Sequence, residues 1–193
     1  MTPIVSLRFL TEPAYVLVGA LLPGDDPTAE VRLLFSTDAV LSYPPTARPI
    51  LEYLSVLRSE ADLVETMHGW GSTPDDLDGL VRDGRIIRFP ADDEDGVRER
   101  LEGLAVRVTA GALAVIDRES VLLHLPTDRR VVVGLESAAV LDTPRLRTLS
   151  EGVHEVSKAT ETPEDFIWRS VIHDLTTLLT TGAGALVRVG AEP

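Results

Sequence analysis

The chain offers few side chains of the kinds that enzymes use to make and break bonds. Its 193 residues include no cysteine and four widely separated histidines: His68, His124, His154 and His173. Thiolate nucleophiles and disulfides are therefore excluded, and the histidines lack the spacing of a zinc site. The sequence also has no phosphate-cradling glycine loop and no serine elbow. We expect no catalytic residues, no metal site and no other cofactor.

The strongest remaining acid–base arrangement is His173 next to Asp174, which could share a helix face with Asp165. Such a pair needs a nucleophile within hydrogen-bond reach to carry out covalent catalysis, and no nucleophile is spaced to join it. We interpret the four histidines as surface or core residues.

A run of four carboxylates at residues 92–95 is the other chemically distinctive segment. It lacks the alternating ligand spacing and the turn glycine of a calcium-binding EF-hand loop, so a solvated charge run is the simpler interpretation. Because the surrounding stretch is poor in apolar residues, we predict an acidic linker at residues 91–103.

The charge balance points away from nucleic acid. The formal net charge is −13, and residues 1–99 hold 8 arginines against 18 acids, whereas residues 100–193 hold 10 basic residues against 13 acids. A negative field repels phosphate backbones and favours cationic partners. Residues 1–10 do not resemble a secretory signal, and no segment approaches the ~18 apolar residues of a membrane span. We expect a cytoplasmic protein that does not bind membranes.

Both halves of the chain show the same order of expected elements. Runs rich in β-branched and apolar residues predict strands, recurrence at three- and four-residue steps predicts helices, and Pro/Gly/Asp clusters mark the turns between them. In the first half these are strands at 4–10, 15–22 and 31–35, helices at 46–57, 59–67 and 74–81, and a closing β run at 85–89. In the second half they are a short helix at 97–104, strands at 104–108, 113–116, 121–125 and 130–135, helices at 144–156 and 166–179, and a closing run at 185–189.

This shared order suggests an internal repeat. Residues 31–41 align with 131–141 at an offset of 100, and the closing runs align at the same offset. Thr73-Pro74 matches Thr162-Pro163 only after a shift, which predicts a shorter middle and a longer last helix in the second copy. Because the identities are few and mostly apolar, convergence stays open as an alternative to duplication.

The sequence therefore predicts an α+β protein of two tandem winged-helix-like units. Each unit would be a three-stranded antiparallel sheet followed by about three helices. The first unit would span residues 1–90 and the second residues 104–193, joined by the acidic linker at 91–103.

Residues 31–89 resemble a known family in three places. Val40-Leu41 ends a strand, Thr46-Ala47 precedes an apolar helix start at 50–54, and Pro74 opens a later helix. This pattern is similar to the PqqD-like peptide-recognition elements of ribosomal-peptide modification pathways, also called RiPP recognition elements, which are a variant of the winged helix. Family members usually have one such unit, whereas this chain would have two.

The resemblance implies peptide binding without chemistry. An extended peptide, for example a precursor's leader peptide, would add as a strand beside the third β-strand and lay apolar side chains against the last helix. In this chain the matching strands are 31–35 and 131–135, and the matching helix segments are 77–81 and 166–172. The peptide-binding residues predicted in this way are Val31, Leu33, Phe35, Leu77, Val81, Val131, Val133, Leu135, Trp168 and Ile172.

Two other functions stay open. A tandem winged-helix transcription regulator would need arginines at the start of a recognition helix, but the two candidate helices begin with acids at 75–76 and 164–165. The other alternative to peptide binding is a scaffold that forms a homodimer and docks a partner enzyme. Trp70, placed between two glycines, either anchors a partner or folds over the core.

Overall fold

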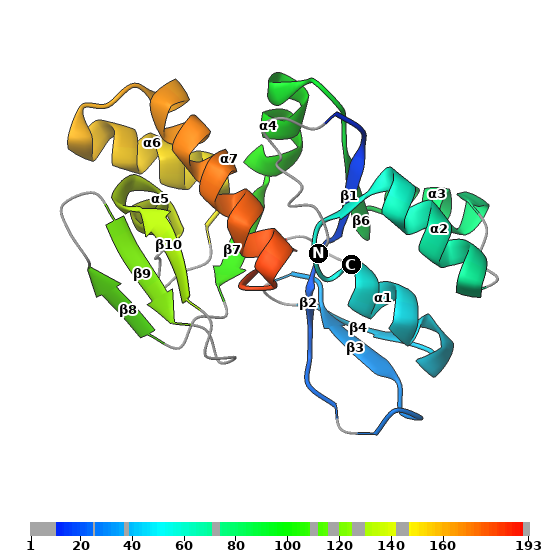
Figure 1. The fold of residues 1–193 in the computed structure, drawn as a ribbon. Coiled ribbons are helices and arrows are strands. Elements are labelled where there is room, and N and C mark those ends of the chain that lie inside the picture. Colours follow the sequence, from blue (N-terminus) through cyan, green and yellow to red (C-terminus); the bar gives the residue numbers. More distant parts are fainter. Residues whose placement is uncertain are drawn as a thin grey trace.

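A computed structural model describes residues 11–24, 26–36, 39–70, 74–108, 112–115, 120–124, 130–141 and 147–190. Within these ranges the protein is α+β, with several small antiparallel sheets and seven α-helices (Figure 1). The strands are β1 (Ala14–Leu17), β2 (Ala20–Leu21), β3 (Val31–Leu34), β4 (Val40–Tyr43), β5 (Arg58–Ser59), β6 (Ile86–Phe89), β7 (Leu104–Val108), β8 (Ala112–Val115), β9 (Ser120–His124), β10 (Arg130–Gly134) and β11 (Gly184–Arg188). The helices are α1 (Arg48–Leu54), α2 (Glu60–Trp70), α3 (Pro74–Arg82), α4 (Glu94–Glu102), α5 (Leu135–Leu141), α6 (Leu149–Thr160) and α7 (Glu164–Thr181), and a 3-10 turn, η1 (Pro45–Ala47), precedes α1.

The two halves repeat one topology. In the first half β1 pairs antiparallel with the closing strand β6, and the sheet β2-β3-β4 precedes three helices. In the second half β7 pairs antiparallel with the closing strand β11, and the sheet β8-β9-β10 precedes three helices. The first half adds the short strand β5, which pairs with β1. The α+β class and the order of sheet before helices are thus as predicted.

The offset between equivalent elements corrects part of the predicted alignment. β3 begins at residue 31 and β9 at 120, β4 begins at 40 and β10 at 130, so the sheets are related by an offset of about 90 residues. Of the two segments aligned at an offset of 100, residues 31–35 therefore belong to the middle strand β3, and residues 131–135 to the outer strand β10. Neighbouring strands carry the same alternation of apolar residues, so the pattern alone cannot tell one strand of a sheet from the next.

The last helix explains the offset of 100 at the closing strands. Helix α7 has 18 residues and its counterpart α3 has nine. The extra length of α7 moves β11 further along the chain relative to β6. A longer last helix in the second half is what the sequence predicts.

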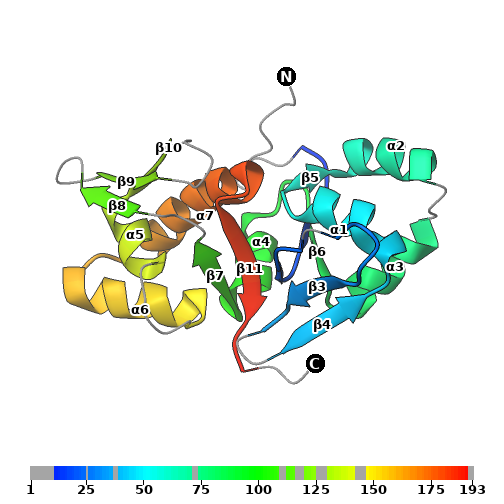
Figure 2. The ribbon, with the colours of Figure 1, turned by 90° about the horizontal axis from the view of Figure 1, so that it is seen from below.

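Strand β11 joins the two halves. It pairs with β7 along its whole length, and isolated parallel bridges connect it to Val18 and Ser36 of the first half. The Gly19 N–H donates to the Leu186 carbonyl at 2.6 Å, and the Arg188 N–H donates to the Phe35 carbonyl at 3.1 Å. In Figure 2 β11 runs between β7 and the β3–β4 pair.

One apolar core is built from both halves. Its fully buried members include Val16 and Phe89 from the first half and Val171, Leu175 and Leu186 from the second. Two smaller cores lie to either side: one under α1, α2 and α3, and one between the β8-β9-β10 sheet and the end of α7.

The short helix predicted at 97–104 is present as α4, which begins at Glu94 and so lies within the segment predicted as an acidic linker. Asp93 caps its start by accepting a hydrogen bond from the Gly96 N–H at 2.8 Å, and Val97 and Leu101, four residues apart, are buried in the shared core. The carboxylates at 92–95 are exposed and lie just before or in the first turn, where the helix dipole favours negative charge. The run is therefore part of a packed amphipathic helix, because two apolar residues at helical spacing suffice to bury one face.

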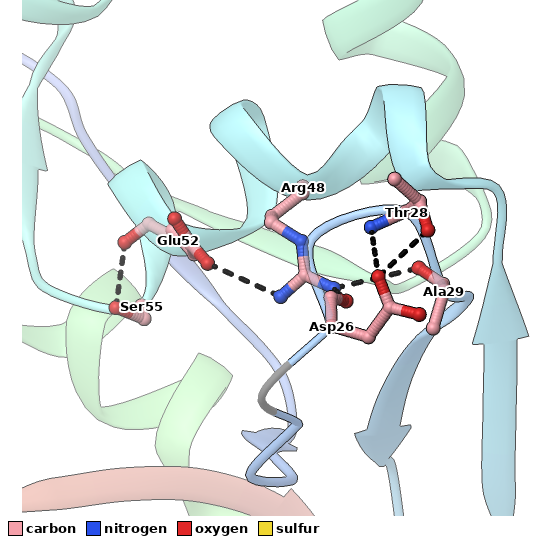
Figure 3. Close-up of polar contacts among 6 residues, drawn as sticks. All are labelled: Asp26, Thr28, Ala29, Arg48, Glu52 and Ser55. Atoms are coloured by element: carbon pink, nitrogen blue, oxygen red, sulfur yellow. Dashed lines mark hydrogen bonds and ion pairs between the residues drawn. The ribbon is translucent and has the colours of Figure 1, made fainter.

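The turn between β2 and β3 is held on helix α1 by a polar network (Figure 3). The Thr28 hydroxyl donates to Asp26 Oδ1 at 2.6 Å, and Arg48 donates to the carbonyls of Asp26 and Ala29 and pairs with Glu52 at 3.5 Å. The hydrogen bonds from the side chain and backbone of Thr28 lower the pKa of Asp26. This network gives the hairpin a defined position over the helix.

Within the described ranges, no helix combines the length and the apolar character needed to cross a bilayer.

Candidate functional site

Most of the residues predicted to bind a peptide lie in the protein interior. Eight of the ten are buried: Val31, Leu33, Phe35, Leu77, Val131, Val133, Trp168 and Ile172. Val81 is half-buried, and Leu135 is 42% exposed. The eight buried side chains are divided among the three cores, so their contacts in this structure are with the fold itself.

Strand β3 has no open edge. It pairs with β2 on one side and with β4 on the other, so the expected strand addition beside residues 31–35 would have to displace a neighbour. Among the described strands, the outer one that leads into the helices is β4 in the first half and β10 in the second. The sequence analysis missed this because the apolar pattern gave strands at 4–10 and 15–22, which made 31–35 the third strand; residues 4–10 lie outside the described residues.

The backbone of β10 alternates between its partner β9 and the outer edge. The Gly134 N–H donates to Asp174 Oδ2 at 2.8 Å, so the backbone groups of Gly134 point away from β9. Because backbone direction alternates along a strand, the N–H and C=O groups of Arg130 and Val132 point to the same outer edge. None of the described strands pairs along that edge.

Side chains on β10 divide in the same alternating way. Val131 and Val133 are buried against α5 and α7, whereas Val132 on the opposite face is 53% exposed. Leu135, at the start of α5, adds a second exposed apolar side chain three residues further along the chain. We call Val132, Leu135 and the outward backbone of β10 the β10 edge.

Helix α7 lies next to one end of this edge. Asp174 projects from α7, is buried, and accepts the hydrogen bond from Gly134 just before α5 begins. A carboxylate at this point also faces the positive end of the α5 dipole. The bond fixes the last residue of β10 against α7.

Strand β4 offers a shorter equivalent edge. The Phe35 N–H donates to the Ala39 carbonyl at 3.0 Å, so residues 35 and 39 face each other and the backbone groups of Val40 and Ser42 point outward. Val40 is 45% exposed. The two repeats therefore present outer strands of the same kind at equivalent positions.

Trp70 packs against a neighbour and stays partly exposed. It ends α2, its ring meets the Tyr53 ring edge to face with centroids 5.4 Å apart, and it is 38% exposed. The contact with Tyr53, itself packed on the first-half core, fits the interpretation that Trp70 folds over the core.

The acid–base residues do not assemble into a catalytic group among the described residues. Asp174 is engaged by Gly134, Asp165 pairs with Arg98 at 3.0 Å, and His173 is exposed. His154 pairs with Glu164 at 2.8 Å. In the described part of the chain, no group of three or more metal-ligating side chains is close enough to hold an ion.

A groove that the sequence analysis did not foresee lies where the two halves meet. It has a volume of about 450 Å³, and three arginines line it: Arg88 on β6, Arg100 on α4 and Arg188 on β11. We call it the arginine groove. The sequence carried one signal for it, since the aligned closing segments 85–88 and 185–188 both end in arginine.

No known protein family, curated protein or solved structure matches the chain.

Proposed function

We propose that the protein is a non-catalytic binding module that captures an extended segment of a peptide or partner protein on the β10 edge. The observation that carries this proposal is the outward backbone of Val132 on an outer strand, next to exposed apolar side chains. The proposed guest segment adds to the sheet as a further strand.

Main-chain hydrogen bonds would supply part of the affinity. Each one formed on an open edge contributes roughly 0.5–1.5 kcal/mol net, because it replaces hydrogen bonds to water. The side chains of Val132 and Leu135 would supply apolar contact and therefore selectivity. This division of labour is typical of peptides that bind by strand addition.

The resemblance to PqqD-like elements supports the same surface. It implies a peptide beside the last strand of the sheet and next to the last helix, and β10 and α7 hold those positions in the second half. We therefore propose the β10 edge as the peptide site in place of the buried residues predicted from the sequence. Each unit is still proposed to be winged-helix-like. A precursor leader peptide is the guest that the resemblance implies.

The charge on the helices argues against the transcription-regulator alternative. Glu164 and Asp165 lie in the first turn of α7, and the Asp165 side chain is largely exposed. Carboxylates at this position would oppose a phosphate backbone.

The test uses a proline substitution on the edge. Val132→Pro removes an N–H that points away from β9, so it blocks a guest strand without removing a hydrogen bond of the β9–β10 pair. Ser42→Pro is the matched control, because it removes an outward N–H from β4 instead. Peptides selected on the wild-type protein from a displayed random library would serve as probes, with affinities measured by fluorescence anisotropy.

We expect Val132→Pro to weaken binding of the selected peptides at least about tenfold, which corresponds to roughly 1.4 kcal/mol. Ser42→Pro should have little effect on their affinity. Equal binding to Val132→Pro and wild type would overturn the β10 edge as the site. Titration with duplex DNA at low salt is the counter-test, and tight, salt-sensitive binding would favour a transcription regulator.

A further inference from the structure

The arginine groove combines a cationic rim with an apolar floor. The half-buried Val81 and Ile87 and the buried Ile86 and Leu104 belong to its apolar lining, and Arg88, Arg100 and Arg188 contribute guanidinium groups. Among the described residues that line the groove, Glu99 is the one acid. This local excess of positive charge occurs in a protein whose formal net charge is −13.

Arg88 is already held by neighbours. Its Nε donates to the Tyr15 hydroxyl at 2.9 Å, and its terminal nitrogen lies 3.5 Å from Glu60. Burial raises the pKa of Tyr15, so the phenol stays protonated and donates to Glu60 while it accepts from Arg88. These contacts orient the Arg88 side chain at the rim.

Arg100 and Arg188 differ from Arg88 in having no acidic partner among the described residues. The Arg100 Nε, and not a terminal nitrogen, donates to the Arg88 carbonyl at 2.8 Å. Arg188 lies over the Phe35 ring at 5.6 Å, and its Nε is buried and has no hydrogen-bond partner among the described residues. Neither guanidinium forms an ion pair with a carboxylate of the described residues.

The fold makes room for Arg188. Gly84 has φ +67, and the Arg188 Nη2 lies 2.6 Å from the position that a side chain at Gly84 would occupy. A half-buried guanidinium with unused donors is unfavourable unless an acceptor is supplied, and planar guanidinium groups match carboxylate and phosphate oxygens in bidentate geometry.

We propose that the arginine groove binds a small organic anion, with its carboxylate or phosphate group held by Arg100 and Arg188 and a short apolar body on the floor. The volume falls in the range of small-molecule sites, roughly 300–1,000 Å³. The site is separate from the β10 edge, since it is lined by β6, α4, β7 and β11.

Isothermal titration calorimetry of the full chain tests this site with three probes: inorganic phosphate, hexyl phosphate and hexanoate. We expect hexyl phosphate to bind more tightly than inorganic phosphate, because only the former reaches the apolar floor. Comparison of hexyl phosphate with hexanoate identifies the preferred anionic group.

Two kinds of variant locate the binding. Arg100→Gln and Arg188→Gln should each weaken binding of hexyl phosphate at least about tenfold. Arg107→Gln should not, because Arg107 is an exposed residue of β7 outside the groove. Gly103→Trp fills the groove from a position where an added Cβ meets no atom within 4 Å, so it should abolish binding with an unchanged circular dichroism spectrum.

Absence of binding by all three probes at millimolar concentration would overturn the proposal, as would unchanged affinity in both Arg188→Gln and Gly103→Trp. Val132→Pro should bind hexyl phosphate normally. Failure of the peptide proposal and failure of this one are therefore distinguishable.

Discussion

Asp174 is the residue whose role changed most between sequence and structure. Beside His173 it suggested acid–base chemistry, but the structure buries it and turns its carboxylate toward the Gly134 N–H at 2.8 Å. The helical spacing of α7 could predict that Asp174 faces inward, since Val171, Leu175 and Leu178 are buried on the same helix. The spacing could not predict the donor, because Gly134 lies 40 residues earlier in the chain.

Replacing Asp174 should weaken the protein. Asp174→Ala removes the acceptor for Gly134, and we expect a loss of about 1–3 kcal/mol in the free energy of unfolding, measured with urea. Asp174→Asn keeps an oxygen acceptor and should lose less. The control is His173→Ala on the exposed side of the same helix, and equal stability of Asp174→Ala and His173→Ala would show that the bond to Gly134 contributes nothing.

Among the elements, strands β2, β3 and β11 approach one another at Gly19, a backbone position that favours glycine. Gly19 lies between β1 and β2 with φ +129, and its N–H donates to β11 at Leu186. A Cβ at this position would lie 2.7 Å from the Leu33 side chain. The close approach of β2, β3 and β11 therefore depends on the missing side chain.

We predict that Gly19→Ala destabilises the protein by roughly 1–3 kcal/mol, because it combines an unfavourable φ with a clash in the first-half core. The measurement is the thermal or urea unfolding midpoint. Gly24→Ala, at a position where an added Cβ has no neighbour within 4 Å, is the matched control. A Gly19→Ala protein as stable as Gly24→Ala would mean that the strands can separate at this point without loss.

At the scale of the molecule, the question is whether the two repeats are independent. Strand β11 connects them by hydrogen bonds, α4 lies between them, and the central core contains side chains from both. A shared core makes separate unfolding of either half unfavourable, because each would expose the apolar surface that the other covers.

The two tryptophans provide a direct measurement, since Trp70 lies in the first half and Trp168 in the second. In the single-tryptophan variants Trp70→Phe and Trp168→Phe, we expect the fluorescence transition to coincide with the circular dichroism transition of the same variant, as in a two-state protein. Leu101→Ala, on the buried face of α4, should lower the free energy of unfolding by about 2–5 kcal/mol, equally in the fluorescence and circular dichroism measurements. Fluorescence and circular dichroism midpoints that separate would support independent units at residues 1–90 and 104–193.

Local patterns in the amino-acid sequence were enough to predict the α+β class, the order of sheet before helices in each half, and the longer last helix of the second half. These follow from periodicity, turn residues and caps, such as the box that Thr148 and Glu151 form at the start of α6, which act over a few residues. The packing of the whole chain was needed to show which strands are outer strands, that the helix predicted at 97–104 begins at 94 and is buried between the two halves, and that Arg100 and Arg188 line one groove. Those features depend on contacts between segments far apart in the chain, where many pairings satisfy the same apolar pattern and the packing of the whole molecule selects one.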